Sequence, residues 1–271
     1  MSGDFALFVA ALATAGLLAG FIGGLFGVGG GIVLVPALFL LFGALGVDAE
    51  VRMHVAIATS LSTIITTSWR SLSTHAKAGA VDWQVLRSWT PWVALGAALG
   101  SALAGAASRE TLQLVFGSGL IVVAAHMGFG NSKWRVAQEM PTGVARAGVA
   151  GSVGVVSALM GIGGGTFGVP IMTLCGRPIH QAVATASGFG AAIAIPATVG
   201  YIIAGWEHDH LPWGSIGFVN APGFVVVALL TALTAPYGAR LAHRLDQKIL
   251  RRSFAIFLAV TAAKMLQSAF T

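Results

Sequence analysis

The sequence predicts an all-α polytopic membrane protein with about eight apolar segments in two repeated halves, each containing a glycine-broken helix. Three observations predict this fold class. Apolar residues make up 56% of the 271 positions, and the mean hydropathy is +0.85. Charged residues make up only 9%, against about 25% in a soluble domain. A glycine-rich motif also occurs twice. We therefore expect neither a soluble enzyme nor a disordered chain.

The net charge of +6 comes from 15 basic and 9 acidic residues. The basic residues lie in short loops, where they act as topology signals of a membrane protein, so we expect no nucleic-acid partner. The single Cys175 cannot form an internal disulfide bond. No Lys or Arg precedes the first apolar run, which we interpret as a retained helix rather than a cleaved signal peptide.

The apolar stretches differ in length. A helix needs about 20 apolar residues to cross the hydrocarbon layer. The first and fifth stretches are too long for one crossing and too short for two, so we expect both to be interrupted. The eight stretches are 5–43, 54–72, 86–107, 111–129, 142–176, 180–205, 215–239 and 250–270.

Each of the two long stretches is cut by a glycine cluster. Residues 27–31 read Gly-Val-Gly-Gly-Gly, and residues 161–165 read Gly-Ile-Gly-Gly-Gly. A proline follows at the same spacing in both stretches, at Pro36 and at Pro170. Matching glycines and a matching proline indicate an internal repeat.

A second block repeats in the same order along the chain. Ala56-Ile-Ala-Thr59 matches Ala182-Val-Ala-Thr185. Two matching blocks in order make coincidence a poor explanation, so we interpret the chain as a duplicated half. The predicted units are a first transmembrane repeat at 1–130, a polar linker at 131–141 and a second transmembrane repeat at 142–271.

The basic loops bear on how the two halves insert. Eight simple crossings would give parallel halves, but they would put the basic loops 70–87, 131–141 and 240–252 on both sides of the membrane. Treating one interrupted stretch as an out-and-back segment puts all three loops on one side and gives inverted repeats. The returning arm, residues 32–43, would then be a half-helix of about 18 Å.

The glycine breaks are the strongest candidate site. Consecutive glycines weaken a helix, and the backbone groups freed by the break must face protein or a wet cavity. The short helices that start near Ile32 and Thr166 would aim their N-termini into the gap, and a helix N-terminus attracts an anion. The alternative is that glycines allow close helix packing, which we favour for the isolated pairs Gly16/Gly20 and Gly96/Gly100.

Hydroxyl side chains form a second candidate feature. Thr59, Thr63, Thr66 and Arg70 fall on one face of a helix. Such a face could line a pore or an anion site, with Arg70 supplying the positive charge. The alternative is that each hydroxyl bonds its own helix or joins two helices. The second half has Pro196 in the place of Arg70, so any charge contact is asymmetric.

These two features give the predicted anion-binding residues. We expect no catalytic residue, no cofactor and no resident metal ion. The predicted site residues are Gly29, Gly30, Gly31, Thr59, Ser60, Thr63, Arg70, Gly163, Gly164, Gly165, Thr166, Thr185 and Ser187.

At the glycine clusters the sequence resembles the TauE/SafE family of sulfite and organosulfonate exporters, also called TSUP. The resemblance implies a bacterial inner-membrane protein that arose by duplication and moves sulfur-containing or other small organic anions, such as sulfite, sulfoacetate or sulfolactate. It extends over essentially the whole chain. The segments that carry it are Gly20–Pro36, Ala56–Ser60, Gly79–Trp83, Ala158–Pro170 and Ala182–Thr185.

We therefore predict a secondary carrier for a small anion that works by alternating access as an exporter. Its partners would be the anion and the lipid bilayer; the sequence leaves the oligomeric state open, a homodimer included. One rival is a passive anion channel. The other is a membrane enzyme or assembly factor that uses His126 or the Glu207–His210 cluster, although no metalloprotease or nucleophile-elbow motif is present.

Overall fold

The computed structural model describes residues 10, 12–14, 16–22, 30–129, 135–242 and 247–270. The described chain is helical except for its connections and one short β-hairpin. A first helical segment, Leu12–Ile22, precedes the others. The elements that follow are α2 (Gly31–Ala44), α3 (Ala49–Lys77), α4 (Trp83–Gly105), α5 (Arg109–Phe129), α6 (Gly143–Met160), α7 (Gly165–Leu174), α8 (Ile179–Ala204), β1 (Ser215–Ile216), β2 (Val219–Asn220), α9 (Ala221–Ala242) and α10 (Gln247–Ala269).

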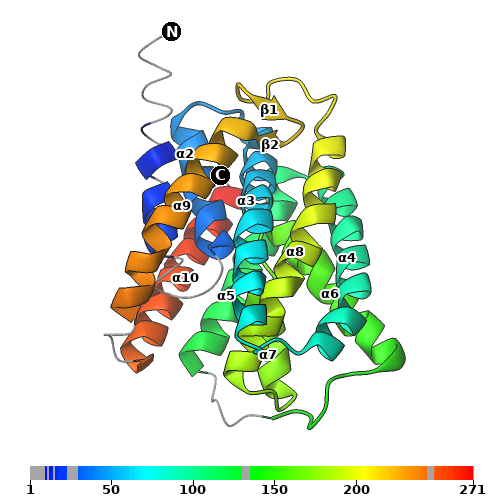
Figure 1. Cartoon of the computed structure of the whole chain (residues 1–271). Helices are drawn as coiled ribbons and strands as arrows, with labels where there is room; N and C mark the ends of the chain where they lie inside the picture. The colour runs from blue at the N-terminus through cyan, green and yellow to red at the C-terminus, as the bar shows by residue number, and fades with distance from the viewer. Residues whose placement is uncertain are drawn as a thin grey trace.

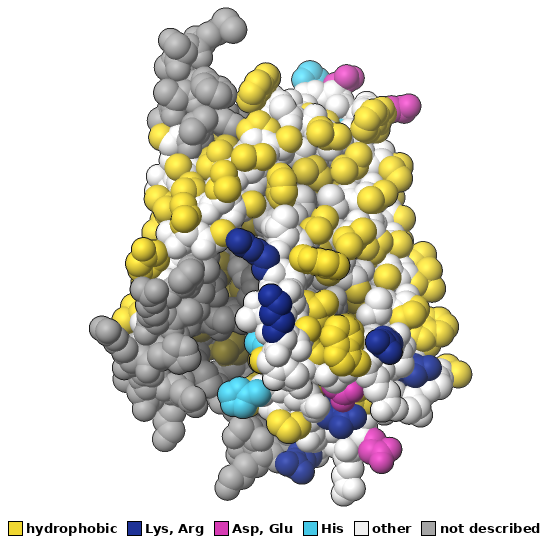
Figure 2. Space-filling model, viewed as in Figure 1, with side chains coloured by type: hydrophobic (Ala, Val, Ile, Leu, Met, Phe, Trp, Pro, Cys, Tyr) yellow, Lys and Arg dark blue, Asp and Glu magenta, His cyan; other side chains and the backbone are white. Residues whose placement is uncertain are grey.

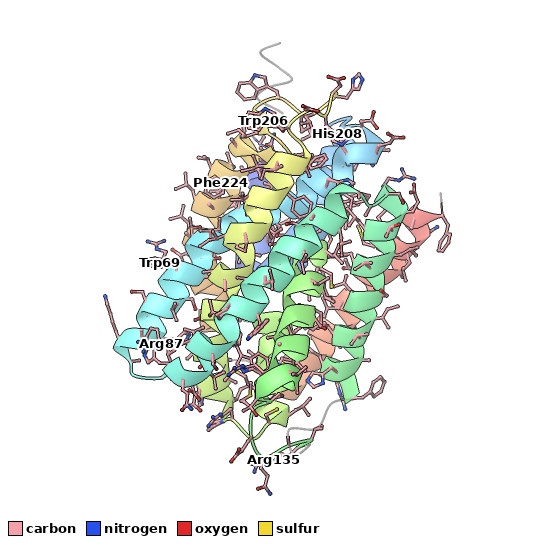
Figure 3. All side chains as sticks on the ribbon, turned by 90° about the vertical axis from the view of Figure 1, so that its right-hand side faces the viewer. Trp69, Arg87, Arg135, Trp206, His208 and Phe224 are labelled. Carbon is pink, nitrogen blue, oxygen red and sulfur yellow. The ribbon has the colours of Figure 1, made fainter. Side chains whose placement is uncertain are left out.

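The long helices form one bundle with two distinct ends (Figure 1). The hairpin end carries the β1–β2 hairpin. The opposite end, which we call the basic end, carries Lys77, Arg87 and Arg135; Figure 3 labels the last two there. Helices α3, α5 and α9 run from the hairpin end to the basic end, while α4, α8 and α10 run the other way.

Both interrupted stretches turn back inside the bundle. In the second stretch, the amides of Val136 and Ala137, which precede α6, donate to the carbonyl oxygen of Leu174 at the end of α7, at 2.9 and 3.3 Å. The entry of α6 and the exit of α7 therefore share the basic end. In the first stretch, α2 begins inside the bundle and ends at the hairpin end, where the connection to α3 lies (Figure 1). At 14 and 10 residues, α2 and α7 reach only about 21 and 15 Å.

The surface is that of an integral membrane protein. On the face shown in Figure 2, hydrophobic side chains cover much of the surface and acidic ones lie near the two ends, while basic ones extend from mid-height to the lower end. Three helices of the described chain are long and apolar enough to cross a membrane, judged by length and composition: Arg109–Phe129, Gly143–Met160 and Ile179–Ala204.

Small residues hold α4 against α6. A methyl group at Gly154 would meet the carbonyl oxygen of Val93 and would lie 2.7 Å from the amide nitrogen of Ala97. A methyl group at Gly100 would lie 2.6 Å from the carbonyl oxygen of Val155. These approaches are to backbone atoms, which cannot rotate away, and they confirm a packing role for the Gly96/Gly100 pair.

This contact predicts a large difference between two glycines of α6. Gly154→Leu should destabilise the fold by about 3 kcal/mol or more, because overpacking at backbone contacts separates the helices. Gly148→Leu should leave stability nearly unchanged, since nothing lies within 4 Å of its added methyl group. Thermal unfolding of the detergent-purified variants measures both effects. Equal midpoints for the two variants would contradict the close α4–α6 contact.

Candidate functional site

The two glycine breaks touch each other in the interior of the bundle. A methyl group at Gly31, the first residue of α2, would lie 2.9 Å from the carbonyl oxygen of Gly161 and 3.1 Å from the Cα of Ile162. Gly31 and Gly161 are both buried. The structure thus brings together two chain segments that are more than a hundred residues apart in sequence.

Each break contains a glycine with a positive φ, a backbone conformation that favours glycine. Gly161 has a φ of 66° and ends α6, where the amide of Ile162 donates to the carbonyl oxygen of Ser157 at 3.1 Å. This pairing is the Schellman arrangement, which satisfies the last helix carbonyls. Gly30 has a φ of 77° and precedes α2, its carbonyl oxygen accepting from the amide of Leu34 at 2.8 Å. Gly29, which was predicted to belong to the site, lies outside the described residues.

Helix α3 is fastened to both breaks. The hydroxyl of Ser60, fully buried, donates to the carbonyl oxygen of Gly161 at 2.8 Å. One turn further along, Ile64 lies 3.0 Å from a methyl position at Gly31 and 3.5 Å from one at Gly163. Ser60 therefore satisfies a carbonyl freed by the break, and Ile64 fills the space between the two breaks.

The two threonines of the repeated block make corresponding contacts. The Oγ1 atom of Thr59 accepts a hydrogen bond from the amide of Asn220 at 3.0 Å, and that of Thr185 accepts from the amide of Asp82 at 2.9 Å. Asn220 directly precedes α9, and Asp82 directly precedes α4. Both threonines are fully buried. Each therefore holds the start of a helix that belongs to the other half of the chain.

The residues held in this way are helix caps. The side chain of Asp82 accepts from the amide of Val85 at 3.1 Å, and that of Asn220 accepts from the amide of Gly223 at 2.8 Å. Such N-caps satisfy amides that have no partner within the helix. Asp82 also forms an ion pair with Arg177 at 3.3 Å, which ties the connection before α4 to the connection before α8.

A cavity of about 790 Å³ opens beside the first break. It is bounded by the first helical segment, the start of α2, the second half of α3, and α8 and α9. Its lining residues are Ala19, Gly20, Gly30, Ile65, Thr66, Thr67, Trp69, Arg70, Ser71, Ala191, Ile195, Ala228, Leu229, Thr231 and Ala232.

Arg70 is the charged side chain in the lining of this cavity. It lies about 9 Å beyond Ile64 along the α3 axis, on the part of the helix that approaches the basic end. Trp69 points away from the bundle beside it (Figure 3). No acidic side chain in the described chain pairs with Arg70. Its charge is therefore available to a ligand in a largely apolar cavity.

The predicted hydroxyl face of α3 is divided by depth. Thr63 is buried, and its hydroxyl donates to the carbonyl oxygen of Ser60 at 2.7 Å. Thr66, one turn on, is exposed and lines the cavity with Arg70. In the second half the hydroxyl of Ser187 donates to the carbonyl oxygen of Ala184 at 2.6 Å. Of the predicted site residues, the cavity lining contains Gly30 and Arg70.

The four predicted residues of the second break differ in burial and in the space around them. Gly163 and Gly164 are buried, and a methyl group at Gly164 would meet Phe189 and the amide nitrogen of Gly190. A methyl group at Gly165 would lie in open space. Thr166 is buried in the first turn of α7, and its Oγ1 atom has no hydrogen-bond partner in the described ranges.

Sequence reasoning missed the contribution of α9 to the cavity. Residues 228–232 read Ala-Leu-Leu-Thr-Ala and carry no motif. The hydroxyl of Thr231 donates to the carbonyl oxygen of Val227 at 2.7 Å, as a structural threonine would. His126, which the sequence offered as the centre of a membrane enzyme or assembly factor, is exposed on α5 and lines neither of the two cavities described for this structure.

Comparison with known proteins identifies the kind of molecule that carries this site. The model of the family described as sulfite exporter TauE/SafE matches residues 12–265. A probable membrane transporter protein of Haemophilus influenzae is 32% identical over 92% of this chain and 95% of its own length. Probable membrane transporter proteins MJ0441 of Methanocaldococcus jannaschii and YunE of Bacillus subtilis are 27% and 26% identical, with 92% of each relative covered.

No solved structure matches this chain significantly. The fold therefore rests on the helices described above, and the kinship rests on sequence. A family model that covers nearly the whole chain and a relative of equal length agree with each other. The protein belongs to the TauE/SafE family of membrane transporters.

Proposed function

We propose that this protein is a secondary carrier that exports a small sulfur-containing or organic anion by alternating access. The observation that carries the proposal is the cavity lined by both Gly30 of the first break and Arg70, which forms no ion pair with an acidic side chain of the described residues. A guanidinium presents donors in a geometry that suits carboxylate or sulfonate oxygens. The hydroxyls of Thr66, Thr67 and Ser71 add further hydrogen-bonding groups in the same lining.

The helix ends at the breaks support an anionic ligand. The N-terminus of α2 begins at the cavity with Gly30, and the first amides of a helix have no partner within it. Those amides and the helix dipole favour negative charge. In the second break, the hydroxyl of Thr166 lies buried in the first turn of α7 and has no hydrogen-bond partner among the residues that the structure describes. A ligand reaching both breaks would find donors on each.

We further propose that the two halves are inverted repeats. The corresponding helices α3 and α8 run in opposite directions, as do α4 and α9 (Figure 1). The reciprocal bonds Thr59–Asn220 and Thr185–Asp82 relate the halves as a two-fold axis would. Inverted repeats around a central site, with broken helices that meet there, are the architecture of many secondary carriers.

The distribution of charge supports insertion in a bacterial inner membrane with the basic end in the cytoplasm. Basic residues outnumber acidic ones towards that end, where the described charged residues include Arg70, Lys77, Arg87, Arg135, Arg146, Arg177 and Arg252 against Asp82 and Glu139. At the hairpin end acidic residues outnumber basic ones, with Asp48, Glu50, Glu110, Glu207 and Asp209 against Arg52 and Arg109. The cavity with Arg70 would then load from the cytoplasm, and a membrane potential of −100 mV would favour export of a monoanion by about 2.3 kcal/mol.

Reconstitution tests this function. Proteoliposomes loaded with unlabelled anion should take up the same anion, labelled, by saturable counterflow, with sulfite, sulfoacetate, sulfolactate, thiosulfate and plain carboxylates compared in turn. Counterflow follows from a carrier because its site is exposed to one side at a time. Unitary currents in a planar bilayer would instead establish a channel. Absence of both counterflow and current for every anion would contradict anion transport.

A further inference from the structure

A second cavity, of about 600 Å³, lies at the hairpin end and shares no lining residue with the first. It is formed by the first turns of α3, the connection from α4 to α5 and the loop before the hairpin. None of the predicted anion-binding residues lines it. Unlike the first cavity, it is lined by many charged and polar side chains.

Carboxylates predominate among the charged groups of this cavity. Helix α3 contributes its first residues, α5 contributes an arginine and a carboxylate, and the loop contributes two carboxylates and two histidines. The lining's titratable and charged residues are Asp48, Glu50, His54, Arg109, Glu110, Glu207, His208, Asp209 and His210. Such a cavity concentrates cations, protons included, and repels the anion that the other cavity is suited to bind.

His54 is the buried member of this set, with 6% of its surface exposed. Its Nε2 atom lies 3.1 Å from the carbonyl oxygen of Ala104. A carbonyl only accepts, so Nε2 carries the hydrogen, and in the neutral ring Nδ1 is then a free lone pair. That Nδ1 atom is buried and has no hydrogen-bond partner among the residues that the structure describes. It is the position at which the ring takes a second proton.

Phe218 of the hairpin turn covers this histidine. Its ring stacks on that of His54 at a centroid distance of 4.8 Å and an interplanar angle of 26°. The Phe218 ring also contacts His208, exposed in the loop, at 5.0 Å, and the buried Tyr201 at 6.5 Å. Strand β2 of the hairpin is bonded to α3 through the amide of Asn220, which donates to the hydroxyl of Thr59. The amide of Phe218 also donates to the carbonyl oxygen of Tyr201 at 3.3 Å, so the hairpin turn is held against α8 while its ring covers His54.

We propose that His54 is a proton-binding site whose occupation is coupled to the lifting of the β1–β2 hairpin. A proton taken from the water at the hairpin end would bind the lone pair of Nδ1 and make the ring a cation with a second N–H. That N–H needs an acceptor, because an unpaired buried charge is costly. With the hairpin in place, Nδ1 is buried and has no hydrogen-bond partner among the described residues, whereas lifting the hairpin would let water from the cavity reach it.

The open state therefore binds the proton more tightly than the closed state does. By linkage, a lower pH at the hairpin end shifts the population towards the open state. The source of the proton and its destination are both the bulk water at that end, so no other reactant is needed. The proposal goes beyond anion transport, since it concerns a different cavity and a different ligand.

Cysteine accessibility tests the coupling without any anion. In a Cys175→Ser background, Val219→Cys places a thiol at a strand position that is 7% exposed, and Ile216→Cys places one at a position in the same hairpin that is 50% exposed. The labelling rate with a membrane-impermeant maleimide is measured for both between pH 8 and pH 5.5. The ratio of the two rates removes the pH dependence of thiol chemistry itself.

We expect the ratio to rise about fivefold or more as the pH falls, and to stay flat in His54→Gln. His54→Asn serves as a second neutral variant, and His126→Gln, on α5 outside the cavity, should leave the rise intact. His208→Gln should retain the rise because Nδ1 of His54 remains. A flat ratio in the protein with His54 intact, or an unchanged rise in either neutral variant, would overturn the proposal. A pH-dependent ratio in a protein that moves no anion would uphold it and refute the proposed function.

Discussion

Arg70→Gln should lower the affinity for the transported anion about tenfold to 150-fold, with little change in stability. The expected loss is that of a hydrogen bond to a charged group, about 1.5–3 kcal/mol. Arg70 lines the cavity without an acidic partner in the described chain, so its removal leaves no carboxylate unpaired. Counterflow as a function of anion concentration measures the affinity, and thermal unfolding in detergent measures the stability.

Two further variants decide whether charge or geometry matters at this position. Arg70→Lys keeps the charge but loses the planar fork of donors, so it should fall between the wild type and the glutamine variant. Arg87→Gln is the matched control, because Arg87 lies at the basic end over the ring of Trp83, outside the cavity. If Arg70→Gln and Arg87→Gln behaved alike, Arg70 would not contact the anion.

Gly164→Ala should destabilise the protein by about 1–3 kcal/mol, a typical cost of overpacking, and should slow transport. The added methyl group would meet Phe189 and lie 2.8 Å from the amide nitrogen of Gly190, so α7 would have to move away from α8. The effect is steric, since Gly164 has a φ of −61°, which any residue adopts. Thermal unfolding and counterflow rates measure the two consequences.

Gly165→Ala is the control beside it in the same cluster. Its methyl group would enter open space, and alanine favours the first turn of α7 by up to about 1 kcal/mol over glycine. The variant should therefore be at least as stable as the wild type. Equal destabilisation of the two variants would mean that the cluster is needed for backbone freedom rather than for the contact with α8.

The breaks could be predicted from the sequence because their causes are local. Consecutive glycines weaken a helix through their own backbone freedom. Pro36 and Pro170 follow the two clusters at the same distance, inside α2 and α7. The length of each interrupted stretch also indicated that a returning arm would be short. Both stretches turn back, although counting charges required only one of them to do so.

The partners of the site residues could not be predicted in the same way. The helical periodicity of Thr59, Thr63, Thr66 and Arg70 correctly gave one face of α3, but it did not show where that face leaves the protein interior. Depth depends on which helices pack beside each turn. Thr59 accepts a hydrogen bond from the amide of Asn220, 161 residues away, and no local sequence pattern predicts such a bond.

The residues that line the cavity could likewise be predicted only in part. Gly30 and Arg70 were identified because a glycine cluster and an arginine in an apolar segment are conspicuous. The α9 residues that complete the wall are alanine, leucine and threonine, which occur throughout the chain. His54 is equally inconspicuous in sequence, and its importance depends on a carbonyl of α4 and a ring of the hairpin.

The reciprocal threonine bonds have a consequence for how the chain is made. The amide of Asp82 is bonded to the hydroxyl of Thr185, which is synthesised 103 residues later. The hydroxyl of Thr59 is bonded to the amide of Asn220, which is synthesised 161 residues later. While the ribosome is still translating α5, the first four helices already in the bilayer lack these partners. Neither bond between the halves can therefore form before the second half of the chain has been made, and the second of them must await synthesis of Asn220.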